Sequence, residues 1–279
     1  MKRMLLTVAA MAAAILAARA TLADPVQELN ERHHFPTKEK FAKVRSSGGQ
    51  NLVNHGGPVI HSAHVVPIFW GPSWGTGGAD NATANHVISF FGQFGTNSHY
   101  AIITQYYDAA GSIHTSSLGN TNWFDSSAPP TNVTDAAVQG EVLKYLASHS
   151  FDASAIYEVF LPPSSYSSDG SATSCGGPNL QYCAYHGNFS NGGRDIKYSA
   201  MPYPSCGGCQ SAGFTAAQNF DHFSCHETRE AVTDEDLNAW YDRRGNEADD
   251  KCAWSPAPFI DGGFGYQYEW SNAAGACVK

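Results

Sequence analysis

Residues 222 to 250 contain the side chains whose types and spacing could do chemistry. The string "SCHETREAVTD" places His226, Glu227 and Glu230 in the pattern H-E-x-x-E, one letter away from the H-E-x-x-H of zinc hydrolases. On an α-helix, residues four apart share a face with Cβ atoms roughly 5 to 6 Å apart, so His226 and Glu230 can converge on one cation. Glu227 then takes the place of the general base that removes a proton from metal-activated water. The pattern predicts a metal-binding helix.

A catalytic metal also needs a third protein ligand and an open position. The string "GNEADDKC" offers Asp250, 20 residues after Glu230, and Glu247, 17 residues after it. Spacing slightly favours Asp250, with Glu247 as the close runner-up and Asp242 and Asp249 behind them. One histidine and two carboxylates would neutralise a divalent ion. Bound water would then be less acidic, and Mn²⁺ or Ca²⁺ would compete better with Zn²⁺.

Three further residues are expected in supporting roles. His222 precedes His226 by four, but ligands at 222, 226 and 230 would span about 12 Å of helix, too far for one ion. We therefore expect His222 in the core or beside the ligands. His186, placed in a loop, could donate a hydrogen bond to the transition state, and Tyr241 could serve as an oxyanion donor.

The same helix is also compatible with roles that involve no metal. It could be a buried polar face that pairs with Arg229, Arg243 or Arg244, because H-E-x-x-E also arises by chance. A serine hydrolase has little support, since the Ser-rich segment 162–174 lacks a G-x-S-x-G elbow. A glycan hydrolase is a weaker option than the metal site, since no second acid can be placed at the required separation.

The elements that must position these side chains alternate between strands and helices. The ligand helix is expected at 215–234, with Thr215 as its N-cap and Phe220 and Phe223 on its buried side. Upstream, the patterns predict helices at 81–95 and 134–149 and strands at 64–71, 155–163 and 195–203. Segment 100–108 reads as a strand or a helix-strand junction, 164–194 as loops, and 265–272 as a terminal strand. The fold class is therefore α/β (α+β), with one domain over 51–279 and a loop-rich second half.

The N-terminal 50 residues are expected to lie outside that domain. Lys2 and Arg3 precede an apolar run over 4–18 that ends in small residues, which is typical of a signal peptide over 1–23. Residues 24–50 read as a polar arm or pro-segment with His33 and His34 in solvent, and the globular part is expected to begin near Leu52. No later apolar run is long enough for a membrane span. We expect secretion to the extracellular space or the periplasm.

Composition narrows the partners. The chain has a net charge of -9, and Lys and Arg are absent between positions 45 and 144, which argues against nucleic acid. Seven cysteines lie in the last 105 residues, and in an oxidising compartment three disulfides and one thiol are expected. Cys252 with Cys277 would staple the C-terminal segment beside the site. A zinc ribbon built on Cys206 and Cys209 is disfavoured because the spacing of Cys175 and Cys183 is wrong.

Four blocks together resemble a known family. They are "NHGGPVIHSAHVVPIFWG" (54–71), "YCAYHGNF" (182–189), "SCHETREAVTDEDLNAWYDRRGNEADDKCAW" (224–254) and "YQYEWSNAAGACV" (266–278). In this order they resemble the phosphate-induced, EXORDIUM-like family of secreted plant proteins and its bacterial and fungal relatives. The resemblance covers most of residues 52–278, and the long third block is its most specific part.

In the microbial relatives the third block runs H-E-x-x-E-A-x-T-D-P, then N-A-W-Y-D, then G-x-E-I-G-D-x-C. This chain departs from it where Glu235 replaces proline and Ala248-Asp249 replaces Ile-Gly, and His222 is outside the pattern. The matching positions are His226, Glu227, Glu230, Thr233, Asp234, Asn238, Trp240, Tyr241, Asp242, Gly245, Glu247, Asp250 and Cys252.

The resemblance implies an extracellular or wall-associated protein, and the helix with its downstream carboxylates looks like a zincin by analogy. We therefore expect a secreted, zinc-dependent hydrolase that acts on a peptide or a cell-wall-associated substrate. The alternative is a non-catalytic wall or signalling protein in which a structural metal or a salt-bridge cluster holds the C-terminal loops.

Overall fold

The computed structural model describes residues 32–44, 50–119 and 121–279. The expected signal peptide, and the part of the polar arm before residue 32, lie outside the described residues. Within the described part of the chain, no helix is long and apolar enough to cross a membrane. The helices are α1 (Lys38–Val44), α2 (Asn81–Phe94), α3 (Ser98–Ala101), α4 (Asp135–Leu146) and α5 (Ala216–Thr233), with 3-10 turns η1 (Ile102–Gln105) and η2 (Gly207–Cys209).

A six-stranded mixed sheet forms the centre of the molecule, in the order β1-β9-β10-β6-β3-β4. Its inner part, β10-β6-β3-β4, is parallel, whereas β1 and β9 are antiparallel to their neighbours. The strands are β1 (Arg32–Pro36), β9 (Tyr182–Asn191), β10 (Arg194–Met201), β6 (Ala155–Phe160), β3 (His64–Trp70) and β4 (Trp123–Asp125). The fold is thus mixed α/β, as the alternation of patterns predicted.

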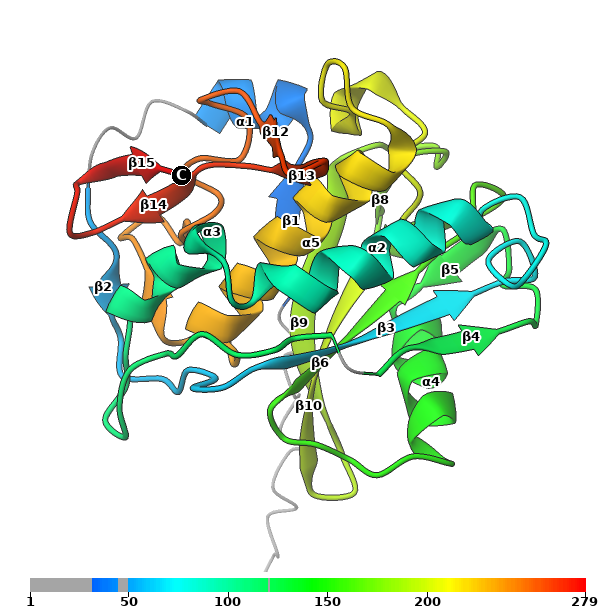
Figure 1. Cartoon of the computed structure of the whole chain (residues 1–279), viewed down its shortest axis with the longest axis horizontal. Helices are drawn as coiled ribbons and strands as arrows, with labels where there is room; N and C mark the ends of the chain where they lie inside the picture. Colours follow the sequence, from blue (N-terminus) through cyan, green and yellow to red (C-terminus); the bar gives the residue numbers. More distant parts are fainter. Residues whose placement is uncertain (1–31, 45–49, 120) are drawn as a thin grey trace, which may run out of the picture.

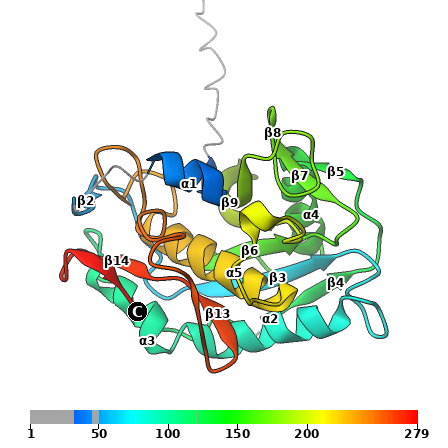
Figure 2. The ribbon, with the colours of Figure 1, turned by 90° about the horizontal axis from the view of Figure 1, so that it is seen from above.

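Helices cover both faces of the sheet. α2 and α5 lie together on one face and α4 lies on the other, as two views at right angles show (Figure 1, Figure 2). Strand β6 illustrates the division, because successive side chains of a strand point to opposite faces. Ile156 and Phe160 join the core under α5, while Tyr157 and Val159 join the core under α4. Because the central strands are buried on both faces, β3 is an almost continuous apolar run and β6 is apolar apart from Glu158.

Four small sheets extend from this centre. They pair β2 (Val53–Asn54) with β11 (Trp240–Tyr241), β12 (Phe259–Asp261) with β13 (Phe264–Tyr266), and β14 (Glu269–Ser271) with β15 (Ala276–Val278), and they join β5 (Asn132–Thr134), β7 (Tyr166–Asp169) and β8 (Ala172–Thr173). The expected terminal strand at 265–272 is therefore wrong: β13 and β14 belong to two separate hairpins. Of the two interpretations of segment 100–108, the strand is wrong and the helix-strand junction is closer, because α3 and η1 run to Gln105 and Tyr107 then forms an isolated bridge with Ser112. The Asn97 side chain accepts the amides of His99 and Tyr100 and starts α3.

The largest correction concerns segment 164–194, predicted as loops. It contains β9, a ten-residue strand whose first six residues are buried. Gly, Ser and Cys lower the strand propensity of this segment, but pairing on both sides with β1 and β10 outweighs that preference. The polar arm differs from expectation too. β1 belongs to the main sheet, so the folded part begins at or before Arg32 and not near Leu52.

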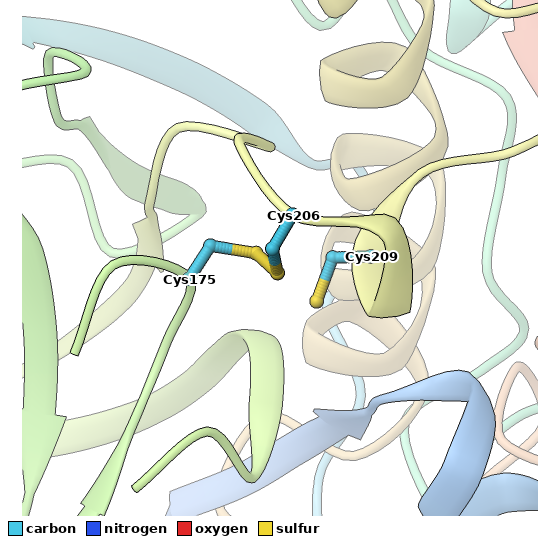
Figure 3. A group of neighbouring side chains, drawn as sticks. All are labelled: Cys175, Cys206 and Cys209. Atoms are coloured by element: carbon cyan, nitrogen blue, oxygen red, sulfur yellow. A yellow bond between two sulfur atoms is a disulfide. The ribbon is translucent and has the colours of Figure 1, made fainter. Parts of the chain in front are cut away.

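Three disulfides stabilise the second half of the chain: Cys175–Cys206, Cys183–Cys209 and Cys252–Cys277. Cys225, buried in α5, is the thiol left over, so the expected count of three bonds and one thiol is confirmed. The sulfur atoms of Cys175, Cys206 and Cys209 lie close together (Figure 3). Each of these three sulfurs is already committed to a disulfide, so the group offers no thiolate to a metal.

Candidate metal centre

Helix α5 is anchored to the rest of the protein at its start and in its middle. Thr215 and Gln218 form a capping box at its start, and Phe220 and Phe223 pack into the core, as the sequence predicted. A buried carboxylate then fixes its middle: Ser224 Oγ and Thr228 Oγ1 donate hydrogen bonds to Glu158 of β6 at 3.2 and 2.7 Å. The helix is therefore anchored to the central sheet on the turns that carry the H-E-x-x-E pattern.

His226, Glu227 and Glu230 are completely buried on this helix. The Nε2 atom of His226 lies 3.1 Å from Oε2 of Glu230, which is the convergence that the four-residue spacing predicts. Nδ1 of His226 lies 3.1 Å from the amide oxygen of Gln267 and donates to it. This hydrogen bond leaves Nε2 unprotonated in the neutral ring and free to bind a cation.

Strand β9 brings a second imidazole to the same place. His186 is buried, with its Nε2 atom 3.6 Å from Oε2 of Glu230 and 3.5 Å from Oε2 of Glu247. The sequence placed His186 in a loop as a transition-state donor, because β9 was not recognised as a strand. With β9 in place, His186, His226, Glu230 and Glu247 form one cluster, which we call the His/Glu cluster.

Within the described part of the chain, several polar atoms of this cluster form no hydrogen bond and contact one another in ion pairs of 3.1 to 3.6 Å. Buried groups normally form hydrogen bonds, and an orphaned one costs roughly 1–3 kcal/mol, so several orphans at one point indicate a missing ligand. The separations of 3.1 to 3.6 Å also match the spacing of about 3.3 Å expected between neighbouring atoms on a tetrahedral Zn²⁺ with bonds of about 2.0–2.1 Å. Among the described residues, the atoms here without a hydrogen-bond partner are His186 Nε2, His226 Nε2, both oxygens of Glu227, Glu230 Oε2 and Glu247 Oε2. The residues present therefore fit a divalent cation.

Glu227 lies next to this centre. Ligand atoms of His186, Glu227 and Glu230 all lie within 4.8 Å of one another. Burial raises the pKa of Glu227 well above its ordinary value, so the carboxyl group favours its protonated form when no cation is present. A group that holds and releases a proton thus lies beside the atoms that could bind the metal.

The imidazoles also hold protons in the metal-free cluster. Burial alone would lower the pKa of His186 and His226, but the neighbouring carboxylates, Glu247 for His186 and Glu230 for His226, raise both to about 10. Burial raises the pKa of Glu247 to about 8. A cation that enters must displace these protons, so its affinity is expected to rise with pH.

The two candidates for the third ligand differ in their surroundings. Asp250 is already engaged: its Oδ2 lies 2.5 Å from His33 Nε2 and accepts the Glu247 amide at 3.2 Å. Its own amide donates to Oε1 of Glu230 at 2.9 Å, and its Oδ1 lies 3.9 Å from Nε2 of His226. Glu247, in contrast, keeps Oε2 free of hydrogen bonds and close to His186. Ligand atoms of His33, Glu230 and Asp250 also lie within 4.8 Å of one another, so both Asp250 and Glu247 border the possible cation position.

His33 is the clearest correction among the candidate residues. It was expected in solvent within a polar arm, but β1 places it over the cluster with Nδ1 3.3 Å from Oε1 of Glu247. Two residues later, the Phe35 ring stacks on His226 with centroids 4.2 Å apart. Because the arm reads as hydrophilic and precedes the strong patterns, its pairing with β9 gave no signal in the sequence.

The remaining predicted residues lie around the cluster. His222 is buried, and its Nε2 faces the carbonyl of Ala253 and the amide oxygen of Gln267, away from the orphaned atoms. Burial lowers the pKa of His222 to about 3, so the ring is neutral. Tyr241 is partly buried, stacks on His55 with centroids 3.6 Å apart, and lines the cavity beside the site.

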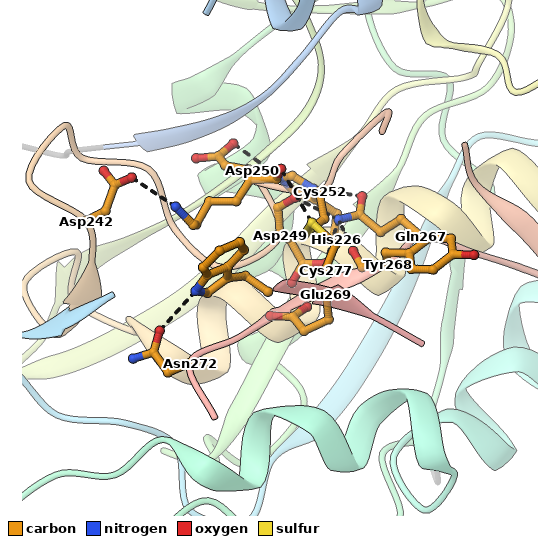
Figure 4. The surroundings of a disulfide bond; sticks show 12 residues. His226, Asp242, Asp249, Asp250, Cys252, Gln267, Tyr268, Glu269, Asn272 and Cys277 are labelled. Carbon is orange, nitrogen blue, oxygen red and sulfur yellow. Dashed lines mark hydrogen bonds and ion pairs between the residues drawn. A yellow bond between two sulfur atoms is a disulfide. The ribbon is translucent and has the colours of Figure 1, made fainter. Parts of the chain in front are cut away.

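The arginines expected in a salt-bridged helix do not pair with the cluster in the described part of the chain. Arg243 and Arg244 are exposed. Arg229 is buried but binds Asp249 and Glu269, with Nε 2.7 Å from the Glu269 carboxylate. Its two carboxylate partners, Asp249 and Glu269, lie in the surroundings of the Cys252–Cys277 disulfide (Figure 4). The buried polar face thus divides into an arginine group and the His/Glu cluster, in which imidazoles pair with carboxylates.

A surface cavity of about 400 Å³ borders the cluster. Its lining joins β1, the end of α5 and the following loop, and consists of Arg32, His33, Asp234, Leu237, Tyr241, Gly245 and Glu247. His33 and Glu247 are the members of the lining that also contact the candidate centre. The cavity therefore approaches the cluster from the side of Glu247.

Comparison with family models, with curated proteins and with solved structures finds no match for this chain. The assignment of the candidate centre therefore rests on its geometry.

His226, Asp250 and Gln267 lie in the surroundings of the C-terminal Cys252–Cys277 disulfide (Figure 4).

Proposed function

We propose that this chain is a secreted, zincin-like metallohydrolase of the peptidase type. The observation that carries the proposal is the set of orphaned buried atoms shared by α5, β9 and the loop at 247. Disulfides are consistent with an oxidising extracellular compartment. Relationship to the phosphate-induced, EXORDIUM-like proteins belongs to the same proposal.

The proposed ligands are His186, His226 and Glu230, binding one Zn²⁺, with Mn²⁺ or Ca²⁺ as weaker competitors. In this set His186 of the sheet supplies the imidazole that the helix lacks at position 230. Two neutral imidazoles and one carboxylate leave a net positive charge on the ion, so the concern that two carboxylates would neutralise it no longer applies. Such a composition is that of catalytic zinc sites with an open fourth position.

Each remaining residue has a defined task in this proposal. A bound divalent ion would lower the pKa of a water molecule and polarise a substrate carbonyl. Glu227 accepts the proton of the attacking water and returns it to the leaving amine, a role open to it because both its oxygens lack protein partners. Glu247 borders the cavity and holds water at the open position, and Tyr241 lies in the cavity wall as a donor to the substrate.

One observation favours a second function, in which the metal is structural. Glu247 Oε2 lies as close to His186 as the other donors do, and four protein ligands would close the site. The chain would then be a non-catalytic wall or signalling protein whose metal ties β9 and α5 to the C-terminal loops.

Metal content of the purified protein tests both proposals. One equivalent of zinc and a lower melting temperature after chelation are expected. If the protein contains no stoichiometric metal and its melting temperature does not change under chelation, the proposed metal site is refuted.

The variant Glu227→Gln separates catalysis from structure, with Glu141→Gln, a buried glutamate under the opposite face, as the matched control. A catalytic site predicts that Glu227→Gln keeps its zinc but loses about 10² to 10⁴-fold in peptide hydrolysis, while the control keeps both. A structural site predicts no hydrolysis in the parent protein.

A further inference from the structure

Strand β1 forms the outer edge of the main sheet and covers the candidate centre. It pairs antiparallel with β9 in a register that sets His33 opposite His186 and Phe35 opposite Ala184. All other strands of this sheet lie at residue 64 or later in the chain. Without β1, the edge of the sheet would be β9, whose backbone donors and acceptors are a template for any extended chain.

The side chains of β1 that face the centre fill two positions. His33 lies over the mouth of the cluster, held by Asp250 and Glu247. Phe35 is completely buried between His226 and Trp254, with ring centroids 4.2 and 5.1 Å away. Phe35 thus fills an aromatic pocket, and one wall of this pocket is His226, a candidate metal ligand.

The alternate side chains of β1 meet an acidic wall. Arg32 contacts Asp135 at the start of α4 at 3.0 Å and Asp169 of β7 at 2.6 Å. His34 lies 3.0 Å from the same Asp169. Since alternate residues of a strand point to opposite sides, the groove along β9 accepts basic residues on one side and an aromatic residue on the other.

His33 differs from the His/Glu cluster in one informative way. Its nitrogen atoms have carboxylate partners, and among the described residues the orphaned atoms begin one layer deeper, at His186 and His226. The nitrogen atoms of His33 are therefore paired with carboxylates of the protein, whereas the deeper atoms lack hydrogen-bond partners.

We propose that the β9 edge is a binding groove for an extended polypeptide with alternating basic and aromatic residues, and that β1 is the occupant supplied by this chain itself. A polypeptide in place of β1 adds an antiparallel strand to β9, puts an aromatic side chain between His226 and Trp254, and passes its backbone across the mouth of the candidate centre. The inference names the substrate class of the proposed hydrolase and rests on that function only for what happens to the peptide after binding.

The test is exchange of a labelled peptide in the full-length chain, with chelator present so that metal plays no part. The probe is a fluorescein-labelled peptide, Arg-His-His-Phe-Pro-Thr-Lys, which has the sequence of residues 32–38. We expect it to bind the double variant His33→Ala/Phe35→Ala, and to bind at least tenfold more weakly when its Phe is replaced by Ala. Wild type and Lys40→Ala/Lys43→Ala, altered at exposed positions of α1, are expected not to bind. A double variant with wild-type circular dichroism that fails to bind the probe would overturn the proposal.

Hydrogen exchange of the wild type provides a measurement that needs no variant. If β1 is an exchangeable occupant, its amides open together at a lower free energy than those of β10 and β6. Exchange of β1 only through global unfolding would show that it is a permanent strand and would refute the proposal. Because neither assay uses metal or turnover, the two proposals can fail separately. A protein that binds the peptide but contains no stoichiometric zinc as purified would refute the hydrolase alone, and zinc-dependent hydrolysis without peptide exchange would refute the groove alone.

Discussion

Nδ1 of His226 donates a hydrogen bond to the side-chain oxygen of Gln267, 3.1 Å away, and this contact decides which nitrogen of the ring faces the cluster. The same oxygen lies 3.0 Å from Nε2 of His222. The Gln267 amide nitrogen in turn donates to the carboxylate and the carbonyl of Asp249. A single glutamine from the segment between β13 and β14 therefore orients the imidazole of α5 and ties it to the loop that carries Glu247.

Replacing this orienting residue should weaken metal binding without touching a ligand. We expect Gln267→Met to lower zinc affinity about 10 to 100-fold, the usual effect of removing a partner of a ligating histidine. Competition with a chromophoric chelator measures the change. Gln139→Met, on α4, is the control and should bind zinc as the parent does; equal affinity in the Gln267 variant would show that the ring needs no orientation.

His186 is a proposed ligand that sequence analysis did not place in the cluster, so its removal tests the proposed ligand set. His186→Ala should abolish stoichiometric zinc at concentrations that saturate the parent. His149→Ala, at an exposed histidine after α4, should leave one equivalent bound. Elemental analysis measures the zinc content of both variants. Full zinc occupancy in His186→Ala would show that His186 is not a ligand and that the ligands come from α5 and the 247–250 loop alone.

Glu158 makes stability depend on pH. Burial raises the pKa of this carboxyl to about 8 from an ordinary value of 4.5, despite hydrogen bonds from Thr228 and Ser224 that lower it. The folded state therefore keeps a proton that the unfolded state releases, and stability falls as pH rises from 4.5 to 8. Glu158→Gln removes this dependence.

Urea unfolding with chelator present measures the effect of Glu158→Gln. Relative to wild type, the variant should gain on the order of 3–5 kcal/mol between about pH 4.5 and pH 8.5. A difference between the two proteins that stays constant over this range would contradict the assignment.

Arg229 compensates two buried carboxylates, and breaking such a group is costly. Arg229→Met leaves Asp249 and Glu269 without their cation, so we expect a loss of about 3–5 kcal/mol in the free energy of unfolding. The triple variant Arg229→Met/Asp249→Asn/Glu269→Gln should recover much of it, since the unpaired charges are then gone. Urea unfolding measures the free energy of unfolding of both variants. If the triple variant is no more stable than Arg229→Met, packing of the arginine matters more than its charge.

The parts of the fold that the sequence predicted are those with strong local patterns. α5 has a capping residue and apolar side chains at helical spacing, and β3 and β6 are mostly apolar runs, so local sequence preference and tertiary packing agree. β9 is different: its Tyr and Phe residues favour a strand, but the segment around it is rich in Gly and Ser, and its partner β1 lies far away in the sequence. Because β9 was predicted as a loop, His186 was not predicted as a candidate ligand.

The choice between Glu247 and Asp250 could not be made from spacing. Both lie on a loop whose course depends on Arg229, on Gln267 and on a disulfide, none of which the distance from Glu230 encodes. His33 escaped notice for a related reason: a polar side chain looks solvated in sequence unless its buried acidic partners are known. The helix positions of the site could be predicted from the sequence, whereas the contributions from strands and loops could not.

The bond between Cys252 and Cys277 has a practical consequence. Cys252 follows Asp250 by two residues, so this bond anchors the loop of Glu247 and Asp250 to the hairpin of β14 and β15. A preparation made in a reducing cytoplasm leaves that loop on noncovalent contacts alone. Its zinc content would then reflect the history of its production as much as the sequence, and batches from oxidising and reducing hosts should be compared before a low metal content is taken as native.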